Sequence, residues 1–286
     1  MPLQPRAFFL DTPRGARYCQ LHAPSQGALR GILIHIHPFA EEMNKARRMA
    51  ALQARAFAES GYAVLQIDLH GCGDSAGDFG EASWQGWIDD VVAAAKWLRS
   101  EAGLPGQPIW LWGLRAGCLL AAAAASLVEG PVNLLFWAPT PAGKALLQQF
   151  LRLKAAGDLM GGQSKAILEA ARKQLAEGAT VDVAGYALPA SVANGLEQAT
   201  LQPSSRVDRL LWLELSTRED AALTPLATTA IARWESTGTV VQSQFVSGPA
   251  FWQTTEIEDA PALIAATLDL VQNPAVATTQ AAPTAP

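Results

Sequence analysis

The sequence predicts an α/β fold in which helices cover both faces of a mostly parallel, doubly wound sheet. Short apolar runs alternate with helical stretches along most of the chain, as expected of strands buried on both faces. One such run ends in a tight turn between two glycines and continues into an alanine-rich helix. The 286 residues, half of them hydrophobic, are enough for one large domain with an insertion, so we do not expect two independent domains.

The chain is expected to begin with an antiparallel pair of strands. Residues 8–10 and 16–22 have strand character and are joined through the turn-forming cluster Thr12-Pro13-Arg14-Gly15. A parallel sheet follows. Its strands are predicted at residues 32–37, 63–69, 109–112, 132–138, 210–215 and 240–246.

The segments that connect these strands have helical patterns. Gly61 and Gly103 follow two of them and are typical helix stops. Trp84 and Trp87 recur at helical spacing on an apolar stripe, so we expect them in the core. The predicted helices cover residues 40–60, 83–100, 116–129, 224–237 and 260–272.

Residues 140–207 interrupt the alternation of strands and helices. Helical segments are predicted at 144–156 and 164–177, whereas Gly161-Gly162 and Pro189 favour irregular structure. Such an insertion is either a lid that moves or a fixed helical cover, and the sequence leaves both open.

The chain is divided into a core, an insertion and a tail. Residues 1–139 and 208–272 are assigned to an α/β core, and residues 140–207 to the insertion. Residues 273–286 are Ala, Thr, Pro and Gln without periodicity, so we expect a disordered tail.

Composition limits the classes of partner. A formal charge of −5 and a pI near 5.4 predict no binding to nucleic acid. No run approaches the ~18 apolar residues of a spanning helix, and the first residues lack the apolar core of a signal peptide. The three cysteines match no zinc or disulfide framework, which favours a reducing compartment. We expect a cytoplasmic protein without membrane insertion that acts on a small molecule, and the sequence leaves a homo-oligomer open.

The most informative segment is the Gly-rich turn after the strand at 109–112. Gly113-Leu114-Arg115-Ala116-Gly117 has the frame of a nucleophile elbow, Gly-x-Ser-x-Gly, in which glycines let the backbone pass close to its neighbours. Arg115 stands where the serine would be. A guanidinium in a protein keeps its proton, so Arg115 cannot act as the nucleophile.

The ends of the predicted parallel strands supply the other candidate site residues, because ligands bind beyond these ends in open α/β sheets. The backbone N–H of Phe39 or Ala40, together with that of Ala116, would form an oxyanion hole. Asp220 follows the strand at 210–215, in the place of a triad acid. Further pocket candidates from the first two parallel strand ends are His37, Glu41, Glu42 and His70.

A catalytic histidine is missing from its expected place. The loop after the last strand, residues 247–252, contains no histidine, and all four histidines lie in the first quarter of the chain. With neither an alcohol at the elbow nor an imidazole opposite it, a Ser-His-Asp mechanism is not supported.

Four short phrases together resemble the exosortase A system-associated hydrolase 2 family, over nearly the whole chain short of the tail. The resemblance implies an α/β-hydrolase fold and a bacterium with the exosortase sorting system, which recognises a carboxyl-terminal sorting signal and is tied to exopolysaccharide production. It implies no particular substrate. The phrases are His-Pro-Phe-Ala-Glu-Glu-Met-Asn-Lys (37–45), Gly-Leu-Arg-Ala-Gly (113–117), Val-Ala-Gly-Tyr (183–186) and Gly-Pro-Ala-Phe-Trp-Gln-Thr (248–254).

Arg115 can be interpreted in two ways. It forms a buried ion pair with Glu41, Glu42 or Asp220, or it forms an anion site with the helix N-terminus, suited to a carboxylate or phosphate. We favour the ion pair because carboxylates are already close in the predicted fold. The aromatic pair Phe251 and Trp252, in the loop that should carry the histidine, is expected to pack in the core or to form an apolar pocket floor.

Two thiols and a metal site are weaker hypotheses. Cys118 lies in the first turn of a predicted helix and is expected to be a packing residue, while Cys72, on a Gly-rich loop near His70, is expected to be more exposed. His35, His37 and Asp68 could in principle hold zinc, but a buried, hydrogen-bonded histidine is the commoner arrangement, so we expect no metal and no cofactor.

Three functions therefore remain open. The first is ester or thioester hydrolysis in the exosortase-linked system by a nonstandard site around Arg115, Asp220 and His37. The second is a non-catalytic protein that binds an acyl or anionic ligand, or a partner protein, through the same pocket. Metal-dependent hydrolysis is the third and the least supported.

Overall fold

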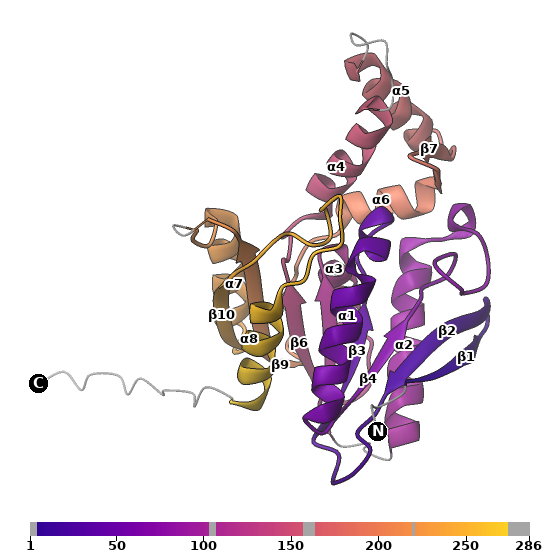
Figure 1. Cartoon of the computed structure of the whole chain (residues 1–286). Helices are drawn as coiled ribbons and strands as arrows, with labels where there is room; N and C mark the ends of the chain where they lie inside the picture. Colours follow the sequence, from indigo (N-terminus) through magenta and orange to yellow (C-terminus); the bar gives the residue numbers. More distant parts are fainter. Residues whose placement is uncertain (1–4, 103–106, 157–163, 219–220, 274–286) are drawn as a thin grey trace, which may run out of the picture.

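The computed structural model describes residues 5–102, 107–156, 164–218 and 221–273. Its main sheet has eight strands: the third to the eighth in spatial order run parallel, and the second is antiparallel to both of its neighbours. The predicted fold class, a mostly parallel sheet with helices on both faces, is confirmed (Figure 1). In spatial order the strands are β1 (Arg6–Thr12), β2 (Gly15–His22), β4 (Tyr62–Ile67), β3 (Gly31–Ile36), β5 (Ile109–Leu114), β6 (Val132–Trp137), β9 (Val207–Ser216) and β10 (Val240–Ser247).

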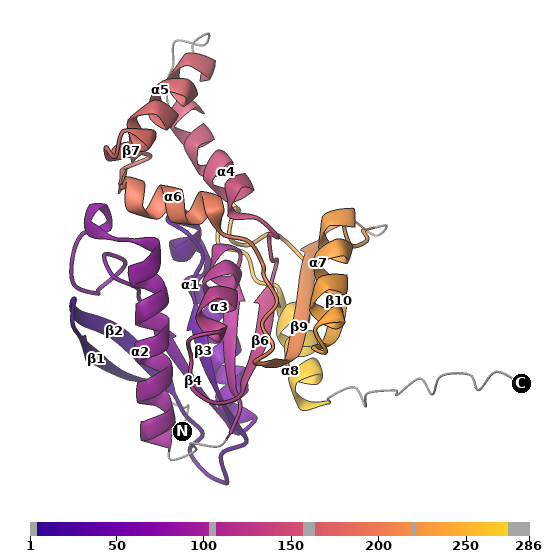
Figure 2. The same cartoon turned by 180° about the vertical axis from the view of Figure 1, so that it is seen from behind.

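Side-chain alternation along the strands divides the core into two layers. In β3, Ile32, Ile34 and Ile36 pack with the helices on one face, and Leu33 packs with those on the other. One layer is formed by α1 (Glu41–Glu59) with α8 (Pro261–Gln272), and the other by α2 (Trp84–Ala102) with α3 (Ala116–Ala125) and α7 (Pro225–Ser236). Figure 1 is seen from the side of α1 and α8, and Figure 2 from the opposite side.

The segment between β6 and β9 forms a helical unit at the upper end of the sheet, where it projects away from the strands (Figures 1 and 2). The predicted helices at 144–156 and 164–177 are present. The short hairpin and the last helix of this unit were not predicted from the sequence. Its elements are α4 (Gly143–Ala156), α5 (Ser164–Ala176), β7 (Val181–Val183), β8 (Tyr186–Leu188) and α6 (Ala190–Gln198).

Three further details differ from the predictions or add to them. The helix predicted to reach residue 129 ends at Ala125, because the chain turns through Gly130, at φ 76°, before β6. A short 3₁₀ helix, Phe79–Glu81, precedes α2. Trp84 and Trp87 are buried as predicted. None of the helices in the described part of the chain is long and apolar enough to cross a membrane.

Close packing of α3 on the sheet depends on the elbow glycines. A Cβ added at Gly117 would collide with the backbone oxygens of Ile36 and His37, and one at Gly113 with the backbone of Gly117 and Cys118. The start of α3 is therefore held directly against the end of β3, so that Arg115 and the β3–α1 connection lie side by side.

We predict that Gly117→Ala lowers the free energy of unfolding by roughly 1–3 kcal/mol, because the collision outweighs the gain of up to ~1 kcal/mol in helix propensity. Urea denaturation measures this change. Gly80→Ala is the matched control, since its Cβ would make only ordinary van der Waals contacts, with the Ala187 Cβ at 3.5 Å and the Ala187 backbone oxygen at 3.6 Å. A Gly117→Ala variant as stable as the wild type would contradict the close packing.

Candidate active site

The backbone of a nucleophile elbow is present although the nucleophile is not. Arg115 connects β5 to α3 at φ 55° and ψ −114°, a conformation that is strained for any residue with a Cβ. Its N–H donates to the Trp137 carbonyl at 3.0 Å, and its carbonyl accepts from the Cys118 N–H at 3.0 Å. Ala40, just before α1, has nearly the same angles, φ 49° and ψ −124°. Two strained turns thus stand next to each other at the carboxyl end of the sheet.

The Arg115 side chain is held by partners from several segments. Its guanidinium lies 3.3 Å from Oε1 of Glu42 in α1, and it donates to Thr140 Oγ1 at 3.1 Å and to Gln149 Oε1 in α4 at 2.9 Å. The Trp252 ring, in the loop after β10, lies 5.7 Å from Cζ. The ion pair favoured from sequence is confirmed, with Glu42 as its acid. Thr140 and Gln149 were not predicted, because nothing in a single sequence relates the insertion to the elbow.

The electrostatics of this pair are set by burial. The Arg115 side chain is 13% exposed and that of Glu42 is 7% exposed. Burial raises the pKa of the Glu42 carboxyl above its ordinary value of 4.5, and the nearby Arg115 charge opposes this rise. Glu41, the other predicted carboxylate, is half-buried and its pKa is also raised by burial. Within the described part of the chain, Arg115 forms its ion pair with Glu42 and not with Glu41.

Little space remains above the elbow. The cavity there has a volume of about 10 Å³, at the lower limit of what holds a single water molecule. It is too small for an acyl chain in this conformation. Its walls are Phe39, Glu41, Glu42, Leu146, Gln149 and Phe150.

His37 is close to the predicted oxyanion residues but cannot act as a base. Its Nε2 accepts from the Leu69 N–H at 3.3 Å, so its Nδ1 carries the proton and donates to the Pro38 carbonyl at 2.8 Å. Burial lowers the pKa of this imidazole, which keeps it neutral. Both ring nitrogens of His37 are therefore occupied by structural hydrogen bonds.

The remaining histidines and carboxylates do not form a metal centre. The His70 ring lies against Gly77, and the His70 N–H donates to Asp90 Oδ2 at 2.8 Å. Within the described part of the chain, no three His, Cys, Asp or Glu side chains come close enough to hold a metal ion. Asp220, the predicted triad acid, lies outside the described residues.

The expectation that Cys72 is exposed was wrong. Both Cys72 and Cys118 are buried, and burial raises the pKa of each thiol. The Gly-rich loop folds back on itself, since the Ser75 hydroxyl donates to the Asp68 carbonyl, and this encloses Cys72. Cys118 packs as predicted, with its thiol donating to the Gly113 carbonyl at 3.2 Å. Neither thiol is an available nucleophile.

Comparison with known proteins agrees with this geometry. Residues 27–167 match the family model for serine aminopeptidase S33. An α/β serine hydrolase without a lid from Xanthomonas campestris is 20% identical and aligns over 96% of this chain and 98% of its own, with a TM-score of 0.54. This protein has the α/β-hydrolase fold. The family model covers just under half of the chain.

Other proteins are also similar to this α/β-hydrolase-fold protein. The ferulic acid complex of Est1E from Butyrivibrio proteoclasticus is 15% identical over 93% of this chain and 98% of its own, with a TM-score of 0.60. Human protein ABHD12B is 29% identical over 98 residues, which are 34% of this chain. The chain spans about a quarter of the length of the curated relatives it matches.

The buried pair predicts a pH-dependent effect of removing Arg115. In Arg115→Met, Glu42 loses its counter-charge, so its folded-state pKa rises further above the unfolded value near 4.5. Below pH 4.5 the carboxyl is protonated in both states and the variant is less affected. Above pH 4.5 the unfolded state ionises first, so the deficit grows with pH to about 3–5 kcal/mol and levels off once the pH exceeds the raised folded-state pKa.

Urea denaturation at pH 4 and pH 8 measures this deficit. Arg152→Met, at an exposed position of α4, is the matched control and should differ little from the wild type at either pH. An Arg115→Met deficit that is the same at both pH values would show that Glu42 is not the group left unpaired.

Proposed function

We propose that this protein is a non-hydrolytic member of the α/β-hydrolase superfamily that acts by binding a ligand or a partner, in association with an exosortase system. The observation that carries the proposal is the Arg115 side chain, which occupies the nucleophile position and bonds to Glu42, Thr140 and Gln149. These bonds leave a cavity of only about 10 Å³ above the elbow.

The chemistry of ester hydrolysis supports this proposal. A serine hydrolase needs an alcohol to attack the carbonyl and an imidazole to take its proton. Here the alcohol is replaced by a cation, and the loop after β10 carries Phe251 and Trp252, both buried, in place of a histidine. Such a site retains at most the residual ~10³ to 10⁴-fold acceleration that comes from binding and oxyanion stabilisation.

The exosortase association rests on the four phrases quoted from the sequence. Three of them supply Arg115 and its neighbours: phrase 37–45 contains Glu42, phrase 113–117 contains Arg115 itself, and phrase 248–254 contains Trp252. Three of the four segments that carry the resemblance therefore contain Arg115 or a residue that contacts it. Three buried free thiols also fit the proposed cytoplasmic location.

Acyl ester hydrolysis by a nonstandard site is the second candidate. It is favoured by the retained positive φ of Ala40 and Arg115, which orients the starts of α1 and α3 as an oxyanion hole requires. Solved structures with this fold include Est1E and a monoglyceride lipase from Saccharomyces cerevisiae, the latter 12% identical with a TM-score of 0.60. Such activity would require α4 to withdraw Gln149 from Arg115.

An ester hydrolysis assay separates the two candidates. Nitrophenyl esters and thioesters with short and medium acyl chains are incubated with the wild type, Arg115→Ala and Asp220→Ala at matched folding. We expect background rates from all three, because none has a nucleophile with a base. The exposed variant Lys165→Ala is the control for changes unrelated to the site. Turnover that falls in Arg115→Ala or Asp220→Ala but not in Lys165→Ala would overturn the proposal.

A further inference from the structure

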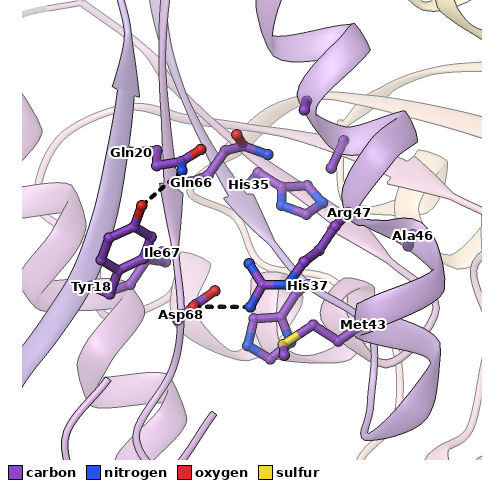
Figure 3. Close-up of a pocket in the computed structure, with 12 residues that line it drawn as sticks. Tyr18, Gln20, His35, His37, Met43, Ala46, Arg47, Gln66, Ile67 and Asp68 are labelled. Carbon is purple, nitrogen blue, oxygen red and sulfur yellow. Dashed lines mark hydrogen bonds and ion pairs between the residues drawn. The ribbon is translucent and has the colours of Figure 1, made fainter. Parts of the chain in front are cut away.

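A second cavity, of about 210 Å³, lies between α1 and the strands β2, β3 and β4. Figure 3 shows polar side chains from all four elements turned toward it. This cavity is distinct from the elbow. Arg47 and Ala50 line it from one side of α1, whereas Glu42 extends from a different side of the helix toward Arg115.

Around this cavity, polar residues take positions on the sheet that apolar core residues fill further along the same strands. Gln20 of β2 pairs with Gln66 of β4, and Gln66 pairs with His35 of β3, so the three side chains form a row across the sheet. Two residues earlier on β3 and β4, the same face carries Leu33 and Val64, which pack in the apolar layer. Opposite the row, α1 offers alanines too small to fill the gap.

The polar row is not satisfied by the protein alone. His35 is 4% exposed, and its Nε2 has no hydrogen-bond partner among the described residues. Gln66 Oε1 is bonded to His22 Nε2 at 2.8 Å, which leaves its amide NH₂ as a donor. Gln20 Nε2 donates to the Tyr18 hydroxyl at 2.8 Å, which leaves its carbonyl oxygen as an acceptor (Figure 3). An unmet buried polar group costs stability, so its presence points to a ligand.

Charge around the cavity selects the class of ligand. Arg47 and Asp68 pair with each other at 3.0 Å, and their charges cancel. Burial lowers the pKa of His35 to about 3, so this imidazole is neutral. No net charge therefore favours an anion or a cation. Donors and acceptors alternate along the wall instead, an arrangement that hydroxyl groups satisfy because each one both donates and accepts.

We propose that this cavity binds a small, uncharged, polyhydroxylated molecule such as a monosaccharide or cyclitol, through His35, Gln20 and Gln66. The volume of about 210 Å³ is many times the ~10–15 Å³ that one water molecule requires, which leaves room for one such ring. The inference concerns a site away from the elbow and does not depend on whether Arg115 abolishes hydrolysis.

Titration of the full-length ¹⁵N-labelled protein, followed by NMR, tests the proposal. The neutral probes are glucose, galactose, mannose and myo-inositol, and the charged probes are acetate, phosphate and choline. We expect saturable shifts with at least one neutral probe and none with the charged probes. No saturable binding of any neutral probe, or equal binding of a charged one, would overturn the proposal.

Variants locate the binding. His35→Leu and Gln66→Leu should each weaken it at least tenfold, and Ala51→Phe, which fills the cavity from α1, should abolish it. His35→Leu should melt no lower than the wild type, because the buried His35 Nε2 has no hydrogen-bond partner among the described residues. The exposed Gln174→Leu is the matched control and should bind as the wild type does. Binding that survives both Ala51→Phe and His35→Leu would place the ligand elsewhere and overturn the proposal.

Discussion

The Arg115 guanidinium joins the segments that meet at the carboxyl end of the sheet. It bonds to α1 through Glu42, to the start of the insertion through Thr140 and to α4 through Gln149. These three segments come from different parts of the chain. Through these bonds, one side chain links the start of the insertion and α4 to the elbow and to α1.

The buried Arg115–Glu42 pair restricts the geometry around the elbow more than it stabilises the fold. Desolvation of a buried ion pair offsets much of its attraction, so the Arg115–Glu42 pair adds little net stability compared with apolar residues of the same shape. Removing one partner is costly, however, because the other is left buried and charged. The strained backbone at Arg115 adds a cost of about 1–3 kcal/mol. A fold that keeps both features is restricted to one geometry around the elbow.

The fold was predictable from sequence because it depends on periodic patterns, whereas the contacts of the site were not. The alternation of apolar runs gave the strands of the main sheet, and the elbow glycines gave the turn at Arg115. Glu42 was among three possible acids, but only the structure separates it from Glu41. The polar row of Gln20, His35 and Gln66 carries a signal that could have been used, since His35 and Gln66 each interrupt an apolar strand on the same face. Its meaning needs the strand register, which no single sequence provides.

The most direct test of this account is a double-mutant cycle between Arg115 and Glu42, measured by urea denaturation at pH 8 for Arg115→Met, Glu42→Leu and the double variant. The account predicts that the double variant is more stable than the sum of the single losses implies, with a coupling energy of about 1–3 kcal/mol. The exposed pair Lys165 and Glu169 in α5 serves as the reference and should show a coupling of at most ~0.5 kcal/mol. Losses at Arg115 and Glu42 that add within ~0.5 kcal/mol would contradict the central role of this contact.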